Sequence, residues 1–301
     1  MGALAMELGS APRSGTLSTV FQHLYRAFSP GVWVWLVSYS GGKDSTLLLF
    51  ASLRFAEERG FALSVVYNDS GGDLPELRGL AYRVLDHVEK LGHAVYVTRP
   101  ERTFFDYLLT RYSPPRWNFR WCCKRLKELP FRRLVSELAR RGPVLNLLGL
   151  RREEARWRSW LVRRAGRGLV YAAPLRDLRA GDVWSLLEEY APRWVVRSLR
   201  EVYGGAERSG CWFCPLVLRD RLLEPRPQLL RLKLEILESW CSGRREHILE
   251  LSERYPELVR VSIGPGELLR GYPCGKRCRT CTVMKVRSIL KTSITEPGAP
   301  L

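Results

Sequence analysis

The sequence of 301 residues has no apolar run near the roughly 18 residues of a membrane-spanning helix. Its N-terminus also lacks the apolar core of a signal peptide. These two absences predict a cytoplasmic protein with no membrane partner. Amide side chains are scarce as well, because Asn occurs only at positions 68, 118 and 146 and Gln only at 22 and 228. Such scarcity is typical of proteins from hot habitats, although the dominance of Arg over Lys also reflects genome composition.

Acidic residues are in deficit, with 31 Asp and Glu against 49 Lys and Arg and a net charge of +18. This excess predicts an anionic partner such as nucleic acid or a strongly phosphorylated ligand. A solvated basic surface is the alternative. The eight cysteines of an intracellular chain favour metal or redox chemistry over structural disulfides, which do occur inside hyperthermophiles.

Short apolar segments alternate with helical stretches over the first two thirds of the chain. We expect helices near 45–59 and 75–91, and strands at 31–37, 63–67, 94–97, 144–148 and about 169–171. This alternation is typical of an α/β fold with a doubly wound, parallel five-stranded sheet. Ligands of such sheets bind at the carboxyl ends of the strands.

The first expected strand leads into a glycine-rich turn, Ser40-Gly41-Gly42-Lys43-Asp44-Ser45. Glycines let the backbone approach an anion closely, and the free N–H groups at the start of the next helix favour phosphate. Lys43 adds a cation, and the serines add hydroxyl donors. The Walker pattern is excluded, because it requires Gly at 37 and Ser or Thr at 44. An ordinary strand-to-helix turn remains the alternative.

The S-G-G-K-D-S turn resembles the pyrophosphate-binding loop of the PP-loop ATP pyrophosphatase superfamily. Three later segments resemble the phosphoadenosine phosphosulfate (PAPS) reductase-like family within it. The matching residues are Asp69, Ser70, Gly71, Pro75 and Glu76, then Gly149, Arg151, Glu154, Ala155 and Arg158, and finally Pro174, Leu175, Asp182, Val183 and Trp184. The first Trp of the last segment is missing. The four segments follow the family's order over about residues 31–216.

The resemblance implies an adenine nucleotide alpha hydrolase-like fold in three parts: an N-terminal helical segment (1–30), a PP-loop nucleotide-binding domain (31–205) and a cysteine-rich, mainly helical C-terminal region (206–301). The implied nucleotide-binding residues are Ser38, Ser40, Gly41, Gly42, Lys43, Asp44, Ser45, Asp69, Gly149, Arg151, Glu154 and Arg158.

Roles follow for several of these residues. Lys43 and Asp44 are the candidate catalytic residues of the loop, and Asp44 is a candidate ligand of Mg²⁺. Asp69 at a strand end could bind ribose hydroxyls or a metal. Glu154 could orient an arginine fork toward phosphate or sulfate. Asp182 is expected to be a helix N-cap rather than a catalyst.

Two cysteine pairs, Cys122-Cys123 and Cys211-x-x-Cys214, resemble the four ligands of the [4Fe-4S] cluster in cluster-bearing adenylylsulfate reductases. Two thiolates of a C-x-x-C loop converge on one face, and adjacent cysteines at a helix start can reach the same cluster. Zinc is the main alternative, and buried structural cysteines or a disulfide remain open.

A second cysteine group comprises Cys241, Cys274, Cys278 and Cys281. Its C-x-x-x-C-x-x-C spacing is superficially that of radical SAM enzymes, but too few residues follow Cys281 for their barrel. A second metal site, sulfur chemistry at thiolates beside Lys276 and Arg277, and a structural role all remain open.

The sequence departs from the reductases in two places. They generally carry a degenerate phosphate loop, whereas Lys43 and both glycines are intact here. Their E-C-G-[LI]-H tail is reduced to Cys274-Gly275. The intact loop therefore favours an ATP pyrophosphatase that adenylates a substrate and transfers sulfur onto a nucleic acid, such as tRNA or DNA, or onto a small molecule. The basic and aromatic run 116–121 also suits a polynucleotide, although it could equally shield a cluster.

The alternative function is an adenylylsulfate (APS) or PAPS reductase that forms sulfite, with Cys274 as the catalytic nucleophile. A nucleotide-binding module without catalysis is a third possibility. The expected cofactors are ATP (or APS/PAPS), Mg²⁺ and a [4Fe-4S] cluster with zinc as its alternative. A sulfur or electron donor protein is the expected further partner.

Overall fold

The computed structural model describes residues 20–24, 26, 34–115, 119–154, 162–164, 168–214, 223 and 225–268. The described residues belong to two compact units. The first is drawn from 1–66, 88–95 and 137–193, and the second from 67–87, 96–136 and 194–301. The domain boundaries expected at 30/31 and 205/206 stay predictions.

Six strands form one sheet in the order β3-β2-β1-β4-β6-β5. The strands are β1 (Val34–Tyr39), β2 (Ser64–Asn68), β3 (Ala94–Thr98), β4 (Val144–Leu148), β5 (Val162–Arg164) and β6 (Leu169–Ala172). Five of them form the predicted all-parallel sheet, so the expected fold class is confirmed. The sixth, β5, pairs antiparallel with β6 at one edge and was not predicted.

The central strands are apolar because both faces are covered. In β4, Val144, Leu145, Asn146 and Leu147 are all buried. Val34 of β1 pairs with Val144, and the ladder continues to Ser38 opposite Leu148. This pairing extends β1 two residues beyond the predicted end at 37, so the loop proper begins at Ser40.

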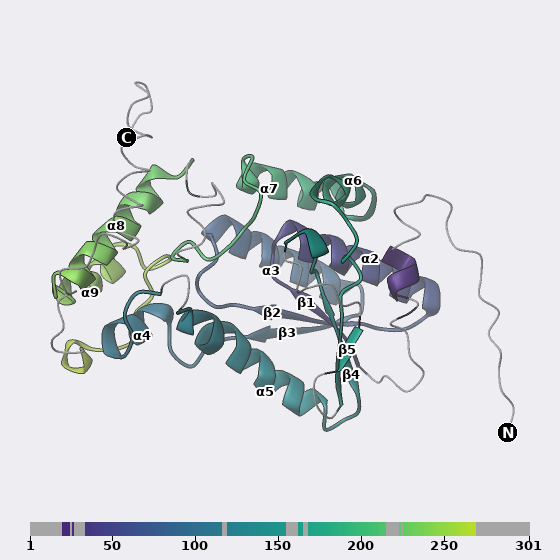
Figure 1. The fold of residues 1–301 in the computed structure, drawn as a ribbon, viewed down its shortest axis with the longest axis horizontal. Coiled ribbons are helices and arrows are strands. Elements are labelled where there is room, and N and C mark those ends of the chain that lie inside the picture. The colour runs from purple at the N-terminus through teal and green to yellow at the C-terminus, as the bar shows by residue number, and fades with distance from the viewer. Residues whose placement is uncertain are drawn as a thin grey trace, which may run out of the picture. The chain divides into compact units, whose positions relative to one another are not determined.

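The helices are α2 (Lys43–Arg59), α3 (Pro75–Lys90), α4 (Phe104–Thr110), α5 (Leu129–Leu138), α6 (Ala180–Tyr190), α7 (Arg193–Tyr203), α8 (Pro227–Cys241) and α9 (Glu246–Arg254). Figure 1 shows them as coiled ribbons. A π-helix, Cys123–Glu128, precedes α5. Pro75 opens α3 as predicted, and α8 and α9 confirm the helical C-terminal region.

In the first unit, α2 packs on β1, β4 and α6. Its last turn meets an aromatic cluster in which the ring of Phe55 stacks on Trp35, with centroids 5.8 Å apart, and contacts Phe21 at 5.9 Å. Phe21 belongs to the short described helical segment that includes 20–24. That segment agrees with the expected N-terminal helix, and the rest of 1–30 lies outside the described residues.

In the second unit, a fully buried carboxylate ties the chain after α9 to α4. Asp106 accepts hydrogen bonds from the Thr103 N–H at 2.8 Å and the Ser262 N–H at 2.7 Å. The Thr103 hydroxyl in turn caps α4 by accepting from the Asp106 N–H at 3.1 Å. Burial of this carboxylate is tolerated because its oxygens are hydrogen-bonded.

Two further points concern the helices. The N-cap of α6 is Arg179, and Asp182 at N3 accepts from the Arg179 N–H at 2.8 Å, so the expected N-cap position of Asp182 was wrong by one turn. Among the described residues, none of the helices is both long and apolar enough to cross a bilayer.

Candidate nucleotide-binding loop and cysteine site

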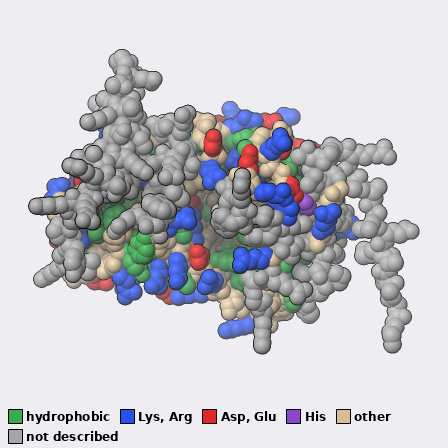
Figure 2. All heavy atoms as spheres, viewed as in Figure 1, with side chains coloured by type: hydrophobic (Ala, Val, Ile, Leu, Met, Phe, Trp, Pro, Cys, Tyr) green, Lys and Arg blue, Asp and Glu red, His purple; other side chains and the backbone are tan. Residues whose placement is uncertain are grey.

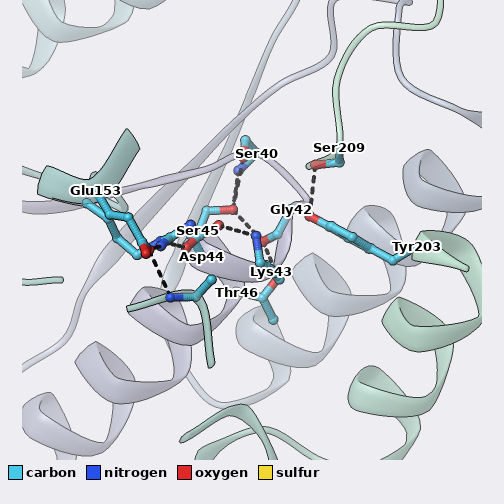
Figure 3. A network of polar contacts seen from close by, with 11 residues as sticks. Ser40, Gly42, Lys43, Asp44, Ser45, Thr46, Glu153, Tyr203 and Ser209 are labelled. Carbon is cyan, nitrogen blue, oxygen red and sulfur yellow. Dashed lines mark hydrogen bonds and ion pairs between the residues drawn. The ribbon is translucent and has the colours of Figure 1, made fainter. Parts of the chain in front are cut away.

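The phosphate loop is shaped by hydrogen bonds among its own residues (Figure 3). Ser45 Oγ donates to the Gly42 carbonyl at 2.9 Å and accepts the Ser40 N–H at 3.1 Å. Because its one proton goes to Gly42, Ser45 Oγ also accepts from Ser40 Oγ, 3.0 Å away. These hydroxyls therefore hold the loop's shape, whereas the sequence suggested that they donate to a ligand.

The loop leaves the start of α2 available to an anion. Gly41 has φ 76°, a left-handed conformation that suits glycine, and Gly42 is the N-cap without any side-chain cap. The first-turn N–H groups of a helix have no intrahelical acceptor, and the N-cap Gly42 has no side chain with which to cap them. With the dipole of a 17-residue helix behind them, they favour phosphate.

Two buried cations meet at one carboxylate beside this turn. Lys43 and Arg151 are 2% and 4% exposed. Lys43 Nζ lies 3.0 Å from Asp44 Oδ2, and Arg151 Nε donates to Asp44 Oδ1. Both oxygens of Asp44 thus hold cations in place. Its predicted role as a Mg²⁺ ligand stays a prediction.

The second arm of the Arg151 fork is held by Glu153, and the expected role of Glu154 stays a prediction. Arg151 Nη1 donates to Glu153 Oε2 at 2.5 Å, and the same oxygen accepts the Ala180 N–H at 3.0 Å. Glu153 therefore links the guanidinium to the first turn of α6. The side chain of Glu154 and all of Ala155 and Arg158 lie outside the described residues.

Gly149 brings the end of β4 against the start of α2. A Cβ at this position would lie 3.0 Å from the Ser45 backbone nitrogen and 3.1 Å from Asp44 C. Only glycine permits this approach, which places Arg151 next to the loop. Ser38 lies inside β1 and donates to Asn146 Oδ1 of β4 at 2.8 Å. Its contact is therefore to the sheet.

Asp69 at the end of β2 is held by three neighbours. Arg78 donates to both carboxylate oxygens, at 3.0 and 2.7 Å, and the Tyr82 hydroxyl donates at 2.7 Å. Arg99 Nε lies 3.5 Å away. Burial works toward a higher pKa for Asp69, but the hydrogen bonds from Arg78 and Tyr82 lower that pKa to about 2. Asp69 thus holds the guanidinium groups of Arg78 and Arg99 in place.

Beside Asp69 lies a cavity of about 110 Å³ at the carboxyl ends of β2 and β3. Its wall includes the cations Arg99 and Arg260 and the hydroxyls of Ser70 and Thr103. A polar cavity at strand ends is where parallel sheets bind ligands, so this one is suited to an anionic group.

The structure brings the two predicted cysteine pairs together in the second unit. Trp121, next to Cys122, stacks on Phe104, and Phe104 stacks on Phe213 of the C-x-x-C segment. The charges of Cys211 and Cys214 also work toward a higher pKa for Cys122. The C-x-x-C segment is a tight turn in which the Cys214 N–H donates to the Cys211 carbonyl at 2.8 Å. The two cysteine pairs, far apart in the sequence, therefore lie in one part of the second unit, which we call the cysteine site.

The thiols of this site differ in acidity. Hydrogen bonding to Cys123 and burial raise the pKa of Cys122, and the same hydrogen bond lowers the pKa of Cys123 to about 6. Burial raises the pKa of Cys211, opposed by Lys127, and the Cys211 charge in turn raises the pKa of Lys127. Burial lowers the pKa of Lys233 to about 7, opposed by Cys214 and then Cys211.

A stack of rings joins the two cysteine pairs. Trp121, which precedes Cys122, stacks on Phe104 with centroids 5.3 Å apart, and Phe104 stacks on Phe213 of the C-x-x-C turn at 3.7 Å. Tyr112 lies on the other side of Trp121 at 4.7 Å. The stack thus connects the segment before Cys122 to the C-x-x-C turn through aromatic contacts.

The cysteine site fits a thiolate-bound group in the chemistry of its donors. Four thiols are gathered, and soft thiolates select iron-sulfur clusters and zinc. Positive charge on Lys127 and Lys233 offsets thiolate charge. In the described part of the chain, however, no three His, Cys, Asp or Glu side chains are already arranged around a metal position. The cluster therefore stays a prediction.

The second cysteine group is only partly visible. Cys241 is the last residue of α8, whereas Cys274, Cys278 and Cys281 lie outside the described residues. No sequence pattern indicated that Glu153 contacts Arg151 and the first turn of α6. For Lys233 a signal existed, because it occupies an inward position of an apolar helix with Leu230 and Leu237.

The sheet order and the loop at the start of α2 define the class, an adenine nucleotide alpha hydrolase-like α/β protein. Residues 35–215 match the model of the phosphoadenosine phosphosulfate reductase domain. The chain belongs to this family. The matched range agrees with the resemblance found over 31–216. No curated protein matches the sequence significantly.

Several solved structures are similar at low identity. A PAPS reductase from Candida auris in a phosphate complex has 13% identity and a TM-score of 0.47, over 67% of this chain and 90% of that chain. A U34-tRNA thiolase from Methanococcus maripaludis with its [4Fe-4S] cluster has 13% identity and a TM-score of 0.42, over 95% and 80%. An FMN adenylyltransferase from Candida glabrata in complex with ATP has 14% identity and a TM-score of 0.35, over 57% and 52%.

Proposed function

We propose that this PAPS reductase-family protein is an ATP pyrophosphatase that adenylates an acceptor and then directs sulfur onto it. The observation that carries the proposal is the phosphate loop with Lys43 and Arg151 buried on Asp44. Burying cations is costly unless anions compensate them, and a bound polyphosphate would add such compensation. A sulfonucleotide has no β,γ-pyrophosphate for this loop to hold.

In the proposed reaction an acceptor oxygen attacks the α-phosphorus of ATP, and the bond to the α,β-bridging oxygen breaks. Pyrophosphate leaves with the electron pair of that bond. Lys43 and the N–H groups at the start of α2 stabilise the charge that develops on this leaving group. The sulfur of hydrosulfide from a sulfide donor then attacks the adenylated carbon, and AMP departs with the former acceptor oxygen.

Cys122, Cys123, Cys211 and Cys214 would hold the [4Fe-4S] cluster, which supplies soft Lewis-acidic iron when bound. Anaerobically purified protein should then be brown and contain iron, and Cys214→Ser should lose both properties. Colourless protein with stoichiometric zinc would exclude the cluster in favour of a zinc site.

A nucleic acid such as tRNA or DNA suits the net charge of +18 as an acceptor. Lys and Arg side chains are distributed over the described surface of the face in Figure 2. If this field binds a polyanion, the affinity for tRNA should fall steeply with salt. A small-molecule acceptor would leave activity nearly independent of ionic strength.

Anaerobic incubation with either ATP or adenylylsulfate tests the reaction. AMP and pyrophosphate from ATP support the proposal. AMP and sulfite from adenylylsulfate, with ATP unused, would establish the second candidate, a sulfonucleotide reductase.

The gathered cysteine site favours the reductase as that second candidate. In the reductase, Cys274 would be the nucleophile, and Cys274→Ser should abolish sulfite formation while nucleotide binding and metal content persist. If Cys274 is instead a ligand of a second metal site, then Cys278→Ser and Cys281→Ser should lower the metal content as well.

A further inference from the structure

Lys233 is a lysine at a core position of a helix outside the matched family domain. It lies on the inward face of α8 and is 3% exposed. A buried ammonium group is costly unless its hydrogens find acceptors. The contacts of Lys233 therefore indicate what this position stabilises.

The ammonium group of Lys233 binds the backbone of the C-x-x-C turn. Nζ donates to the Trp212 carbonyl at 2.9 Å and to the Cys214 carbonyl at 2.8 Å. These carbonyls lie on either side of Phe213. One side chain thus holds both halves of the turn between Cys211 and Cys214.

The opposite side of the turn is fixed by the segment after β2. The Trp212 N–H donates to the Gly72 carbonyl at 2.9 Å. A Cβ at Gly72 would lie 2.9 Å from Cys211 Sγ and 2.6 Å from Phe213 Cζ, so the two segments are in close contact. The turn is therefore held from one side by Gly72 and from the other by Lys233.

We propose that Lys233 is the positioning residue of the Cys211–Cys214 half of the cysteine site. By this contact α8 becomes part of the site, although it follows the family domain in sequence. The ammonium fixes the direction of both carbonyls and thereby the conformation that carries the two thiols. The inference rests on the proposed function only in treating Cys211 and Cys214 as ligands of the cluster.

The test compares three substitutions in the full chain. Lys233→Met keeps the length and apolar volume but removes the donors. Lys233→Arg keeps the charge and several donors. Arg231→Met is the matched control, because it removes an exposed cation from the same helix. Backbone hydrogen exchange is followed in peptides covering 209–214, 119–126 and 144–148, without added metal.

Lys233→Met should accelerate exchange in 209–214 by about tenfold, because local opening no longer breaks the two hydrogen bonds from Lys233 Nζ. The peptides 119–126 and 144–148 should change little. Lys233→Arg should restore most of the protection, and Arg231→Met should leave it unchanged. Unchanged exchange in 209–214, or equal acceleration in all three peptides, would overturn the proposal, since the latter indicates a general structural role.

If Lys233→Met does not fold, Lys233→Gln takes its place, because it keeps an amide donor on a shorter side chain. Its exchange should increase in 209–214 alone, and no increase there would equally overturn the proposal. A second readout is the iron retained after anaerobic incubation with Fe²⁺ and sulfide, which should be lower for Lys233→Met than for Lys233→Arg. If the wild-type chain retains no iron, the cluster proposal is contradicted. The hydrogen-exchange result still tests whether Lys233 positions the C-x-x-C turn.

Discussion

Asp44 and Arg151, 107 residues apart in the sequence, form a buried ion pair at the start of α2. The pair fixes the guanidinium beside the phosphate loop, while the other carboxylate oxygen holds Lys43. One acidic residue of the loop therefore positions two cations, which is a role that the residue type alone does not indicate.

Removal of the Lys43 ammonium should weaken ATP binding. A charge-assisted hydrogen bond is worth roughly 1.5–3 kcal/mol, so Lys43→Ala should raise the Kd for ATP roughly 10- to 150-fold. Titration calorimetry measures this change. The exposed Lys90→Ala is the control and should leave the Kd within about twofold. An unaltered Kd in Lys43→Ala would exclude the loop as the pyrophosphate site.

A double-mutant cycle tests the Asp44–Arg151 pair. Either Asp44→Asn or Arg151→Gln removes the charged contact between the two residues, while Glu153 still holds Arg151 and Lys43 still pairs with Asp44. Each variant should therefore lower the unfolding free energy by roughly 1.5–3 kcal/mol. The double variant should cost less than the sum of the two by over about 1 kcal/mol in urea denaturation. The exposed pair Arg197–Glu201 is the control, with an expected coupling below about 1 kcal/mol. Equal coupling in both pairs would contradict the buried pairing.

A methyl group at Gly72 should disturb the cysteine site. The contacts of its Cβ with Phe213 and Cys211 are too short, and Phe213 cannot move easily because it stacks on Phe104. Gly72→Ala should therefore destabilise the protein by roughly 1–3 kcal/mol. Gly79→Ala, inside α3 with open space around its Cβ, should instead stabilise it by roughly 0.5–1 kcal/mol. The two variants having equal unfolding midpoints would refute the close packing.

Asp69 should make stability depend on pH in the acid range. Its pKa in the folded state is about 2, below the value of about 3.9 in the unfolded chain. Its contribution is therefore complete above about pH 4 and is lost as the pH falls through about 2. Asp69→Asn should lower the unfolding free energy by roughly 2 kcal/mol at pH 7, and the difference should shrink steadily below about pH 4. A pH-independent difference in denaturant unfolding would argue against the arginine contacts.

Much of the fold could be predicted because the buried strands are continuous apolar runs. The predicted strand 144–148 coincides with β4, and the two preceding strands differ by a residue at their ends. The end of β1 was missed because Ser38 and Tyr39 are polar, and only the pairing with β4 extends the strand. Strand β5 could not be predicted, because Val162–Arg164 carries no alternating pattern and exists through its pairing with β6.

The sequence predicted which residue types form the candidate site, but it predicted few of the contacts between them. The turn at 40–45 shows its glycines, lysine and serines in the sequence, but not that the hydroxyls of Ser40 and Ser45 are used within the loop. The contact of Glu153 with Arg151 comes from a short 3₁₀ turn, which the sequence motif did not indicate. Lys233 depends on a tertiary contact with carbonyls about twenty residues earlier, for which local patterns give no evidence.

The pairing of β1 with β4 also has a consequence for synthesis on the ribosome. At about 5–20 residues per second, the 107 residues that separate Asp44 from Arg151 take roughly 5 to 20 s to translate. Throughout that interval the apolar edge of β1 that later meets β4 lacks its partner, and the start of α2 lacks Gly149, which packs against it. A nascent chain paused before residue 144 therefore exposes an aggregation-prone edge, so chaperone binding is most needed in this window.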